Sequence, residues 1–271
     1  MASLDMDSFA GALKQHYTNE KIENMVYKDN PFLAMLSKYE DFGGENLKLP
    51  VKYGIPMGRS ATFGDAVNNK SASQIKAFLL ERKADYAIAS IANETIEASK
   101  GNANAFIEAA TFEIDGAIEA ATRSLAVSLY GDGSGQIGVV GSRSTIDSTL
   151  TNDGITLATV QDITNFEVGM QLNFGTATAN KEIININRDT GLIQVNASSG
   201  ASDSDAIYVD GDKDKKLTGL GGWLPSSAPT SATFFGVDRS VDATRLGGIR
   251  FAGESLPLEE ALIGAAARVA R

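Results

Sequence analysis

Residues 104–129 read NAFIEAATFEIDGAIEAATRSLAVSL, the clearest structural signal in the chain. Apolar residues recur every three or four positions, which is the pattern of an amphipathic helix with one buried face. At 1.5 Å per residue the predicted helix is about 39 Å long. Its apolar face is rich in alanine, so we expect a neighbouring element to approach it closely. The face consists of Ile107, Ala110, Ile114, Ala117, Ile118, Ala121, Leu125 and Leu129.

The segment that follows this helix, GDGSGQIG at residues 131–138, has the Gly-x-Gly-x-x-Gly spacing of dinucleotide-binding loops. In those proteins the loop follows a strand and precedes a helix, so that the helix N-terminus faces the phosphates. Here the order is reversed, because the helix comes first. Glycine is expected just past a helix, since it tolerates positive φ. We therefore interpret these glycines as the end of the helix and a turn, and we predict no cofactor.

The composition argues against several classes of function. The chain has 271 residues, with 34 acidic and 24 basic side chains and a net charge of −10. It has no cysteine and one histidine, His16, which excludes thiolate nucleophiles, disulfides and most hydrolase triads. A negative field repels nucleic-acid phosphates, so the chain is better suited to enclose DNA than to bind it tightly. No apolar run is long enough to span a bilayer and no secretory signal is evident, so we expect synthesis in the cytoplasm and no membrane contact.

Residues 43–85 have the pattern of a long two-stranded hairpin. One limb, ENLKLPVKYG, alternates apolar and polar residues, and QIKAFLLERKADYAIASI returns after a loop rich in Gly, Asn and Ser. Fully extended limbs would reach about 50 Å. An isolated ribbon cannot cover its own apolar face, so another part of the chain or a neighbouring copy must pack on it. Residues 1–42 form an arm too poor in apolar residues for its own core, with a predicted helix at 8–28.

The chain after the glycine turn is rich in short strand patterns. Between residues 151 and 216 these are ITLATV, MQLNF, EIININ, LIQVN and AIYV, separated by turn sequences. They predict a small antiparallel barrel or sandwich inserted into the main domain. Residues 217–271 are rich in loops until Pro257, after which LEEALIGAAARVAR predicts another amphipathic helix. The predicted fold class is α+β.

Three groups of residues resemble chemical sites. The spacing of Asp210, Asp212 and Asp214 is that of a calcium loop, but Lys215 and Gly221 stand where such a loop needs Gly and Glu. His16 has no evident nucleophile to activate. Two groups of acidic residues could supply the pair of carboxylates that glycoside hydrolysis needs. They are Glu108, Glu113 and Asp115, and Glu254, Glu259 and Glu260. Acidic residues on amphipathic helices usually face solvent. We predict no catalytic residue and no metal ligand.

The predicted hairpin carries four lysines, Lys48, Lys52, Lys70 and Lys76. They either contact acidic residues of a neighbouring copy or keep an exposed strand from aggregating, and both roles are compatible.

The order of these parts resembles that of the major capsid proteins of tailed bacteriophages, whose fold is shared with encapsulins and with the floor of herpesvirus capsids. The resemblance covers essentially the whole chain, including the helix that ends in YGDGSGQIG and the return through LTGLGGWLP and FFGVDRSVDATRLGG. It implies a continuation of the axial domain past residue 271, so we expect this chain to be shorter than the natural product. The implied parts are an N-terminal arm (1–42), an extended loop (43–85), a peripheral domain (86–150) with its spine helix (104–129), an inserted β domain (151–216), and the return to the peripheral domain with the start of an axial domain (217–271).

The resemblance implies a structural subunit, not an enzyme, that assembles into an icosahedral head around double-stranded DNA without binding it specifically. Expected partners are further copies in hexamers and pentamers, with separate scaffolding, portal and decoration proteins. The expected location is the virion, after assembly in the bacterial cytoplasm. Some relatives cross-link this loop through a lysine and an asparagine, but Lys70, Asn68 and Asn69 have no second partner that can be matched. The expected subunit-interface residues are Phe9, Leu13, Leu47, Leu49, Val51, Tyr53 and Phe63.

Two alternatives remain. An encapsulin uses the same fold to hold cargo enzymes. The β insertion and the loops favour a phage capsid protein over an encapsulin. A carbohydrate-binding or carbohydrate-active β-rich protein would be a stable monomer with a cleft of aromatic and acidic residues. The single tryptophan, Trp223, and the lack of aromatic residues clustered near the insertion disfavour that class.

Overall fold

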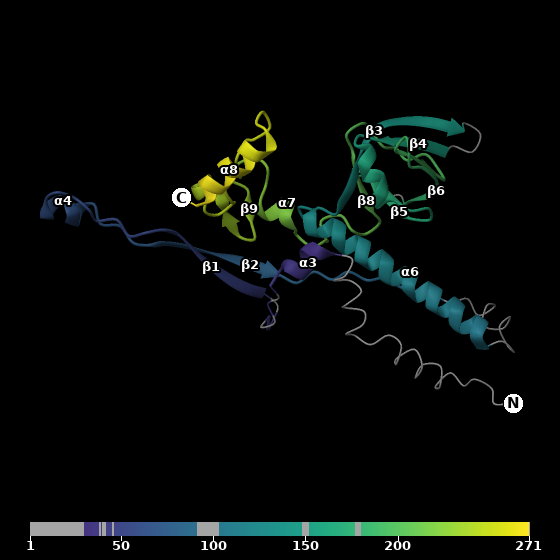
Figure 1. Ribbon diagram of the computed structural model, residues 1–271, viewed down its shortest axis with the longest axis horizontal. Helices are drawn as coiled ribbons and strands as arrows, with labels where there is room; N and C mark the ends of the chain where they lie inside the picture. The colour runs from purple at the N-terminus through teal and green to yellow at the C-terminus, as the bar shows by residue number, and fades with distance from the viewer. Residues whose placement is uncertain are drawn as a thin grey trace. The chain divides into compact units, whose positions relative to one another are not determined.

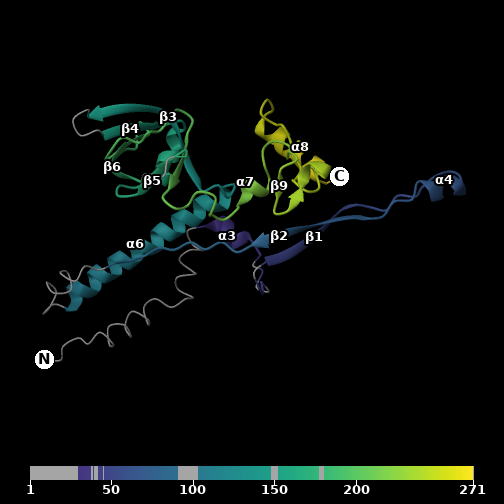
Figure 2. The same ribbon diagram turned by 180° about the vertical axis from the view of Figure 1, so that it is seen from behind.

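The computed structural model describes residues 30–37, 39, 42–44, 46–90, 103–147, 152–176 and 180–270. The fold is a mixture of helices and antiparallel sheets, which confirms the predicted α+β class (Figures 1 and 2). Two compact units are each built from two stretches of the chain, Met1–Lys38 with Ala84–Leu217 and Tyr39–Lys83 with Thr218–Arg271. The predicted helix at 8–28, with Phe9, Leu13 and His16, lies outside the described residues.

The long helix of the first unit, α6 (Ala103–Tyr130), confirms the strongest prediction from the sequence. Where its side chains are described, the predicted apolar stripe is the less exposed side. Leu129 is buried and Ile118 and Leu125 are half-buried, whereas Glu113 and Glu119 are exposed. A short helix, α3 (Pro31–Met35), contacts the end of α6, where the rings of Phe32 and Tyr130 stack with 5.3 Å between their centroids.

The rest of this unit is dominated by a closed six-stranded barrel, in the order β3-β4-β7-β6-β5-β8. Every neighbouring pair is antiparallel. A short 3-10 helix, η1 (Val160–Asn165), connects β4 to β5. The strands are β3 (Gln136–Asp147), β4 (Asn152–Leu157), β5 (Gln171–Phe174), β6 (Lys181–Asn187), β7 (Leu192–Val195) and β8 (Ala206–Val209).

Five of these strands match the five predicted from the sequence, and β3 is additional. It pairs with both β4 and β8 and so closes the barrel, whose strands therefore begin at Gln136, not after residue 150. Its register shifts at three places, between Gln136 and Gly138, between Val140 and Ser142, and between Thr145 and Asp147. Each shift reverses the alternation of side chains, which explains why the sequence of β3 lacks a strand pattern.

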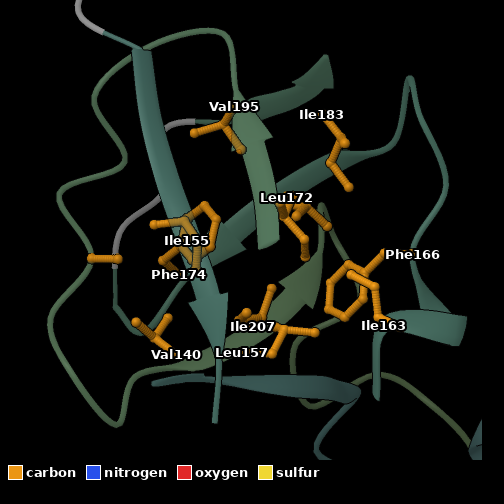
Figure 3. Packing of buried hydrophobic residues seen from close by; sticks show 12 residues of the cluster. Val140, Ile155, Leu157, Ile163, Phe166, Leu172, Phe174, Ile183, Val195 and Ile207 are labelled. Atoms are coloured by element: carbon orange, nitrogen blue, oxygen red, sulfur yellow. The ribbon is translucent and has the colours of Figure 1, made fainter. Parts of the chain in front are cut away.

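The interior of the barrel is filled by apolar side chains (Figure 3). Phe166, which follows η1, has no exposed surface and packs among strand residues such as Leu172 and Ile207. Gly138 lies against the ring of Phe166, and a Cβ at this glycine would be 3.0 Å from the ring. The barrel is therefore a packed core and not a channel.

A buried carboxylate fixes a loop to this barrel. Asp153 on β4 is 1% exposed, and its Oδ2 lies 2.9 Å from Nε of Arg143 on β3. The same oxygen accepts hydrogen bonds from the backbone N–H of Ser199 at 2.6 Å and from its hydroxyl at 2.8 Å. This carboxylate oxygen thus has three partners, and the loop between β7 and β8 is held to β3 and β4.

The second unit contains the predicted hairpin. β1 (Asn46–Gly54) pairs antiparallel with β2 (Gln74–Glu81), from Asn46 opposite Glu81 to Gly54 opposite Gln74. The predicted return strand was too long, because the described residues after Glu81 form no strand up to residue 90. At the far end the chain forms a short helix, α4 (Phe63–Asn68), where a loop was predicted. Thr62 caps this helix by accepting the N–H of Asp65 and donating its hydroxyl to the Asp65 carboxylate.

The C-terminal part of the second unit has little regular structure before its last helix. The short strands β9 and β10 are joined by Phe235 and Gly236, both with positive φ, as in a type I′ turn. The predicted final helix is present; its Gly264 lies close to Phe251, and its Ala261 lies close to Gly253. Among the helices in the described part of the chain, none combines the length and hydrophobicity that crossing a bilayer requires. The elements are α7 (Leu220–Trp223), β9 (Thr233–Phe234), β10 (Val237–Asp238), η2 (Arg239–Asp242) and α8 (Leu258–Val269).

Candidate interaction surface

The base of the hairpin rests on three aromatic side chains, which we call the aromatic platform: Trp223, Phe234 and Phe235. Trp223 stacks on Phe235 with 5.5 Å between ring centroids, and Phe234 makes T-shaped contacts with both of these rings. Phe78 of β2 is 3% exposed and packs against Trp223 and Phe234. Val51, Tyr53 and Leu80 contact the same cluster. One face of the hairpin base is therefore covered by its own chain.

Polar contacts hold the platform in place. The backbone N–H of Leu79 donates to the carbonyl of Phe235 at 2.9 Å, and Arg245 donates to the carbonyl of Tyr53. Arg239 lies with its guanidinium 3.7 Å from the centroid of Phe234, and its Nη1 donates to the carbonyls of Gly222 and Trp223. Burial lowers the pKa of Arg239, but the ordinary value is so high that the side chain stays charged. These contacts hold the base of the hairpin in place against the aromatic platform.

Among the residues that the structure describes, none covers the outer half of the hairpin, residues 55–73, in this way, and we call this part the hairpin tip. The two limbs stay linked there, since the N–H of Ser71 donates to the carbonyl of Met57 at 2.6 Å and the Ser71 hydroxyl accepts the N–H of Met57. Beyond this point lies α4, at the end of the two limbs (Figure 1). Its Phe63 is 87% exposed, and Ile55, Met57 and Val67 are each more than half exposed. The hairpin tip thus exposes several large apolar side chains on one element.

The expected interface residues fall into two groups. Val51 and Tyr53 are half-buried against the platform, and Leu47 is half-buried. Leu49 is 44% exposed and Phe63 is far more exposed, so these two remain available to a partner. Phe9 and Leu13 lie outside the described residues. The tip residues Ile55, Met57 and Val67 were not expected from the sequence, although Thr-x-x-Asp at residues 62–65 is a recognisable helix start.

A cavity of about 760 Å³ lies in the first unit between α6, the glycine turn and the barrel. Within it Ser124 lies 2.7 Å from Nζ of Lys216, as in a serine–lysine catalytic dyad. Lys216 also contacts Asp85 at 2.7 Å and Asp212 at 3.1 Å. Burial alone would lower the pKa of Lys216, but hydrogen bonds and charges from the two carboxylates outweigh it and raise the pKa above its ordinary value. A lysine held protonated in this way gives Ser124 no base.

The other candidate chemical residues are engaged or dispersed. Asp210 accepts hydrogen bonds from the side chains of Asn173 and Asn180, and Asp212 is paired with Lys216. Glu254, Glu259 and Glu260 are exposed beside and on α8. In the residues that the structure describes, no three His, Cys, Asp or Glu side chains are grouped so that they could hold a metal ion.

Two glycines of GDGSGQIG adopt a backbone conformation that favours glycine. The turn follows the end of α6 and leads into β3, the reverse of the order in a dinucleotide-binding loop. Gly133 and Gly135 have φ of +95° and +79°. Asp132 accepts hydrogen bonds from the N–H and hydroxyl of Ser134, and these hydrogen bonds hold its pKa below the ordinary value against the opposing effect of burial. The geometry is that of a tight turn between a helix and a strand.

We expect Gly135→Ala to destabilise the first unit by about 2 to 5 kcal/mol, because it combines backbone strain of about 1 to 2 with a steric clash of about 1 to 3. A Cβ at Gly135 would lie 2.5 Å from the carbonyl oxygen of Asp212. Gly169→Ala is the matched control, since Gly169 has φ of +90° but open space around its Cβ position. Urea denaturation measures the free energy of unfolding of both variants, and the difference between their losses is the cost of the clash. Equal losses would contradict the close approach of Gly135 to the Asp212 carbonyl.

Comparisons of the chain with protein-family models, with curated proteins and with solved structures found no match. Function is therefore inferred from the residues of the chain itself.

Proposed function

We propose that this chain is the structural subunit of a closed protein shell, of the kind that the major capsid proteins of tailed bacteriophages build around double-stranded DNA. The observation that carries the proposal is the hairpin. Its base is fixed on the aromatic platform, while its tip presents Phe63 and neighbouring apolar residues without a core of its own.

A fixed base and an uncovered tip are the features of an arm that reaches a neighbour. A two-stranded ribbon is marginal by itself, so exposed apolar residues at its end are stabilised when another surface covers them. If each copy offers a tip and receives one on a different surface, the contact is heterologous. Contacts of this type close into rings when the rotation between copies allows it, and the rings can then tile a shell.

The order of elements supports the same proposal. A hairpin, a long helix, a β unit and a final amphipathic helix follow one another as in the capsid proteins that the sequence resembles. On this proposal the copies form hexamers and pentamers, with separate scaffolding, portal and decoration proteins, and the virion is the final location. The chain encloses DNA without specific contacts and carries no catalysis.

The aromatic platform argues against the carbohydrate-binding alternative. Trp223, Phe234 and Phe235 pack against one another and against Phe78, so these rings serve as a core for the hairpin. An encapsulin-type shell would use the same assembly contacts, and the contents of purified particles distinguish it from a phage head.

Sedimentation velocity with negative-stain electron microscopy, over a series of protein concentrations, tests the proposal. We expect the wild type to form rings or closed particles far larger than the 28.5 kDa monomer. The double variant Phe63→Ser with Val67→Ser should weaken association at least tenfold, because it removes the apolar tip and leaves the platform intact. Val168→Ser with Ile184→Ser is the matched control, since it changes two exposed apolar side chains of the barrel. A wild type that stays monomeric at its highest attainable concentration would refute the proposal.

A further inference from the structure

The cavity between α6, the glycine turn and the barrel plays no part in the proposed shell. Its volume of about 760 Å³ is ample for a small organic ligand. Most of its wall is apolar, and the apolar residues that line it include Val127 of α6, Ile137 of β3, Met170 before β5 and Val209 of β8. Each of these residues is only half-buried. The cavity therefore holds apolar surface that an apolar ligand can bury.

Charged residues form two groups in the wall of this cavity, and the first group is balanced. Arg123 of α6 and Arg188 after β6 both contact the carboxylate of Glu167. Arg123 also lies 2.7 Å from the carboxylate of Glu119. Two guanidinium groups thus face two carboxylates, and this group offers no excess charge to a ligand.

The second group has an excess of negative charge. Nζ of Lys216 lies 2.7 Å from Oδ2 of Asp85 and 3.1 Å from Oδ2 of Asp212, so one ammonium group serves two carboxylates. Asp132 lines the same cavity. Among the described residues it accepts hydrogen bonds from Ser134 but forms no ion pair. Three carboxylates and one ammonium group give a net charge of −2.

Of these three carboxyl groups, Asp212 is the one whose pKa lies above its ordinary value. Burial raises this pKa, and the charges of Asp85 and Asp210 add to the effect, although the hydrogen bond and the charge of Lys216 oppose it. Burial would also raise the pKa of Asp85, but hydrogen bonds from Lys216 and Ser124 outweigh it and lower the value. The ionised form of Asp212 is therefore the one that a further cation in the cavity stabilises most.

We propose that this cavity binds a small organic cation, with its apolar body against Val127, Met170 and Val209 and its ammonium group beside Asp132 and Asp212. The ammonium group donates charge-assisted hydrogen bonds, which the carboxylates accept. A neutral molecule of the same size gains the apolar burial alone, and an anion is repelled by the excess negative charge. The inference goes beyond the proposed function, since it concerns a single chain and holds whether or not copies assemble.

Isothermal titration calorimetry of the full chain tests this proposal with three ligands that share one apolar body. Octylammonium, 1-octanol and octanoate carry positive, zero and negative charge at neutral pH. We expect octylammonium to bind with a dissociation constant below about 1 mM, the range open to a ligand of this size. Its affinity should be at least tenfold higher than that of 1-octanol, and octanoate should bind more weakly than 1-octanol.

A charge variant tests the acidic part of the cavity. Asp212→Asn should reduce the preference for octylammonium over 1-octanol at least fivefold, because it removes one negative charge beside the ammonium group, and it should leave the affinity for 1-octanol within about twofold. Asp214→Asn is the matched control. It makes the same change in charge at an exposed residue that does not line the cavity, and asparagine accommodates the φ of 60° at this position. The control should leave both affinities within about twofold of the wild type.

A filling variant tests the apolar part. Val127→Phe places a ring in the cavity and should weaken the binding of octylammonium and 1-octanol at least tenfold. Val241→Phe is the control, since it adds the same ring at an exposed position in the other unit. Circular dichroism on heating verifies that each variant is folded, and the charge variant tests the site independently of the filling variant.

Three results would overturn the inference. The first is a dissociation constant of octylammonium above about 1 mM. The second is binding of octylammonium no tighter than that of 1-octanol or octanoate, because the cavity then does not select a cation. The third is binding that persists in Val127→Phe, or that falls equally in Asp212→Asn and Asp214→Asn, because the ligand then lies elsewhere. None of these results bears on assembly, which sedimentation of the wild type tests separately.

Discussion

Phe78→Ala is expected to destabilise the second unit by about 3 to 5 kcal/mol, the usual cost of removing a buried phenylalanine ring. Phe78 is the residue through which β2 meets both Trp223 and Phe234, so the cavity left behind lies between the hairpin and the platform. The strands then lose the cover for their apolar face, and a two-stranded ribbon without cover is marginal. We therefore expect both lower stability and a mobile hairpin base.

Two measurements check this prediction. Scanning calorimetry should show the loss in the transition of the second unit, while the transition of the barrel stays in place because its core shares no residue with the platform. Hydrogen exchange at Leu49 and Leu79 should become faster. Phe63→Ala is the control, because the same ring is removed from an exposed position and stability should change by no more than about 0.5 kcal/mol. Unchanged exchange in Phe78→Ala would mean that the platform does not fix the hairpin.

Asp153→Ala is expected to cost about 2 to 5 kcal/mol in the first unit, because this buried carboxylate is the shared partner of one cation and two hydrogen-bond donors, and each buried donor left unsatisfied costs about 1 to 3 kcal/mol. The variant leaves Arg143 without its carboxylate, and it leaves the N–H and hydroxyl of Ser199 without an acceptor. The loop between β7 and β8 then loses its attachment to β4.

Urea denaturation followed by circular dichroism measures this loss. Asp203→Ala serves as the control, because Asp203 is an exposed aspartate in the same loop region and its removal should change stability by no more than about 0.5 kcal/mol. The double variant Arg143→Met with Asp153→Leu removes both charges and should recover part of the stability. If it is no more stable than Asp153→Ala, the ion pair is not the source of the loss.

The elements predicted from the sequence are those with strong local patterns. The 3.6-residue period of α6 runs over seven turns, and five barrel strands are bounded by turn sequences, so both were recognisable. β3 was not, because its three register shifts interrupt the alternation. The helix at residues 63–68 was hidden by its shortness and by the glycine and asparagine residues around it.

The interaction surface was only partly predictable. Alternation in β1 identifies Leu49, Val51 and Tyr53 as one apolar face, but it does not tell whether this chain or a neighbour covers that face. The answer depends on Trp223, Phe234 and Phe235, which lie far away in sequence and in loops without any period. The charge of the hairpin, in contrast, is readable from composition alone once the limits of the hairpin are known.

The division of each unit between two stretches of chain has a consequence for synthesis on the ribosome. Phe78 is translated about 145 residues before Trp223, a delay of roughly 7 to 30 s at ordinary elongation rates. The barrel, which needs only residues 136–209, can close during that interval. The hairpin has no platform until residues 223–235 emerge. In a nascent copy the base of the hairpin therefore stays without its aromatic cover during that interval.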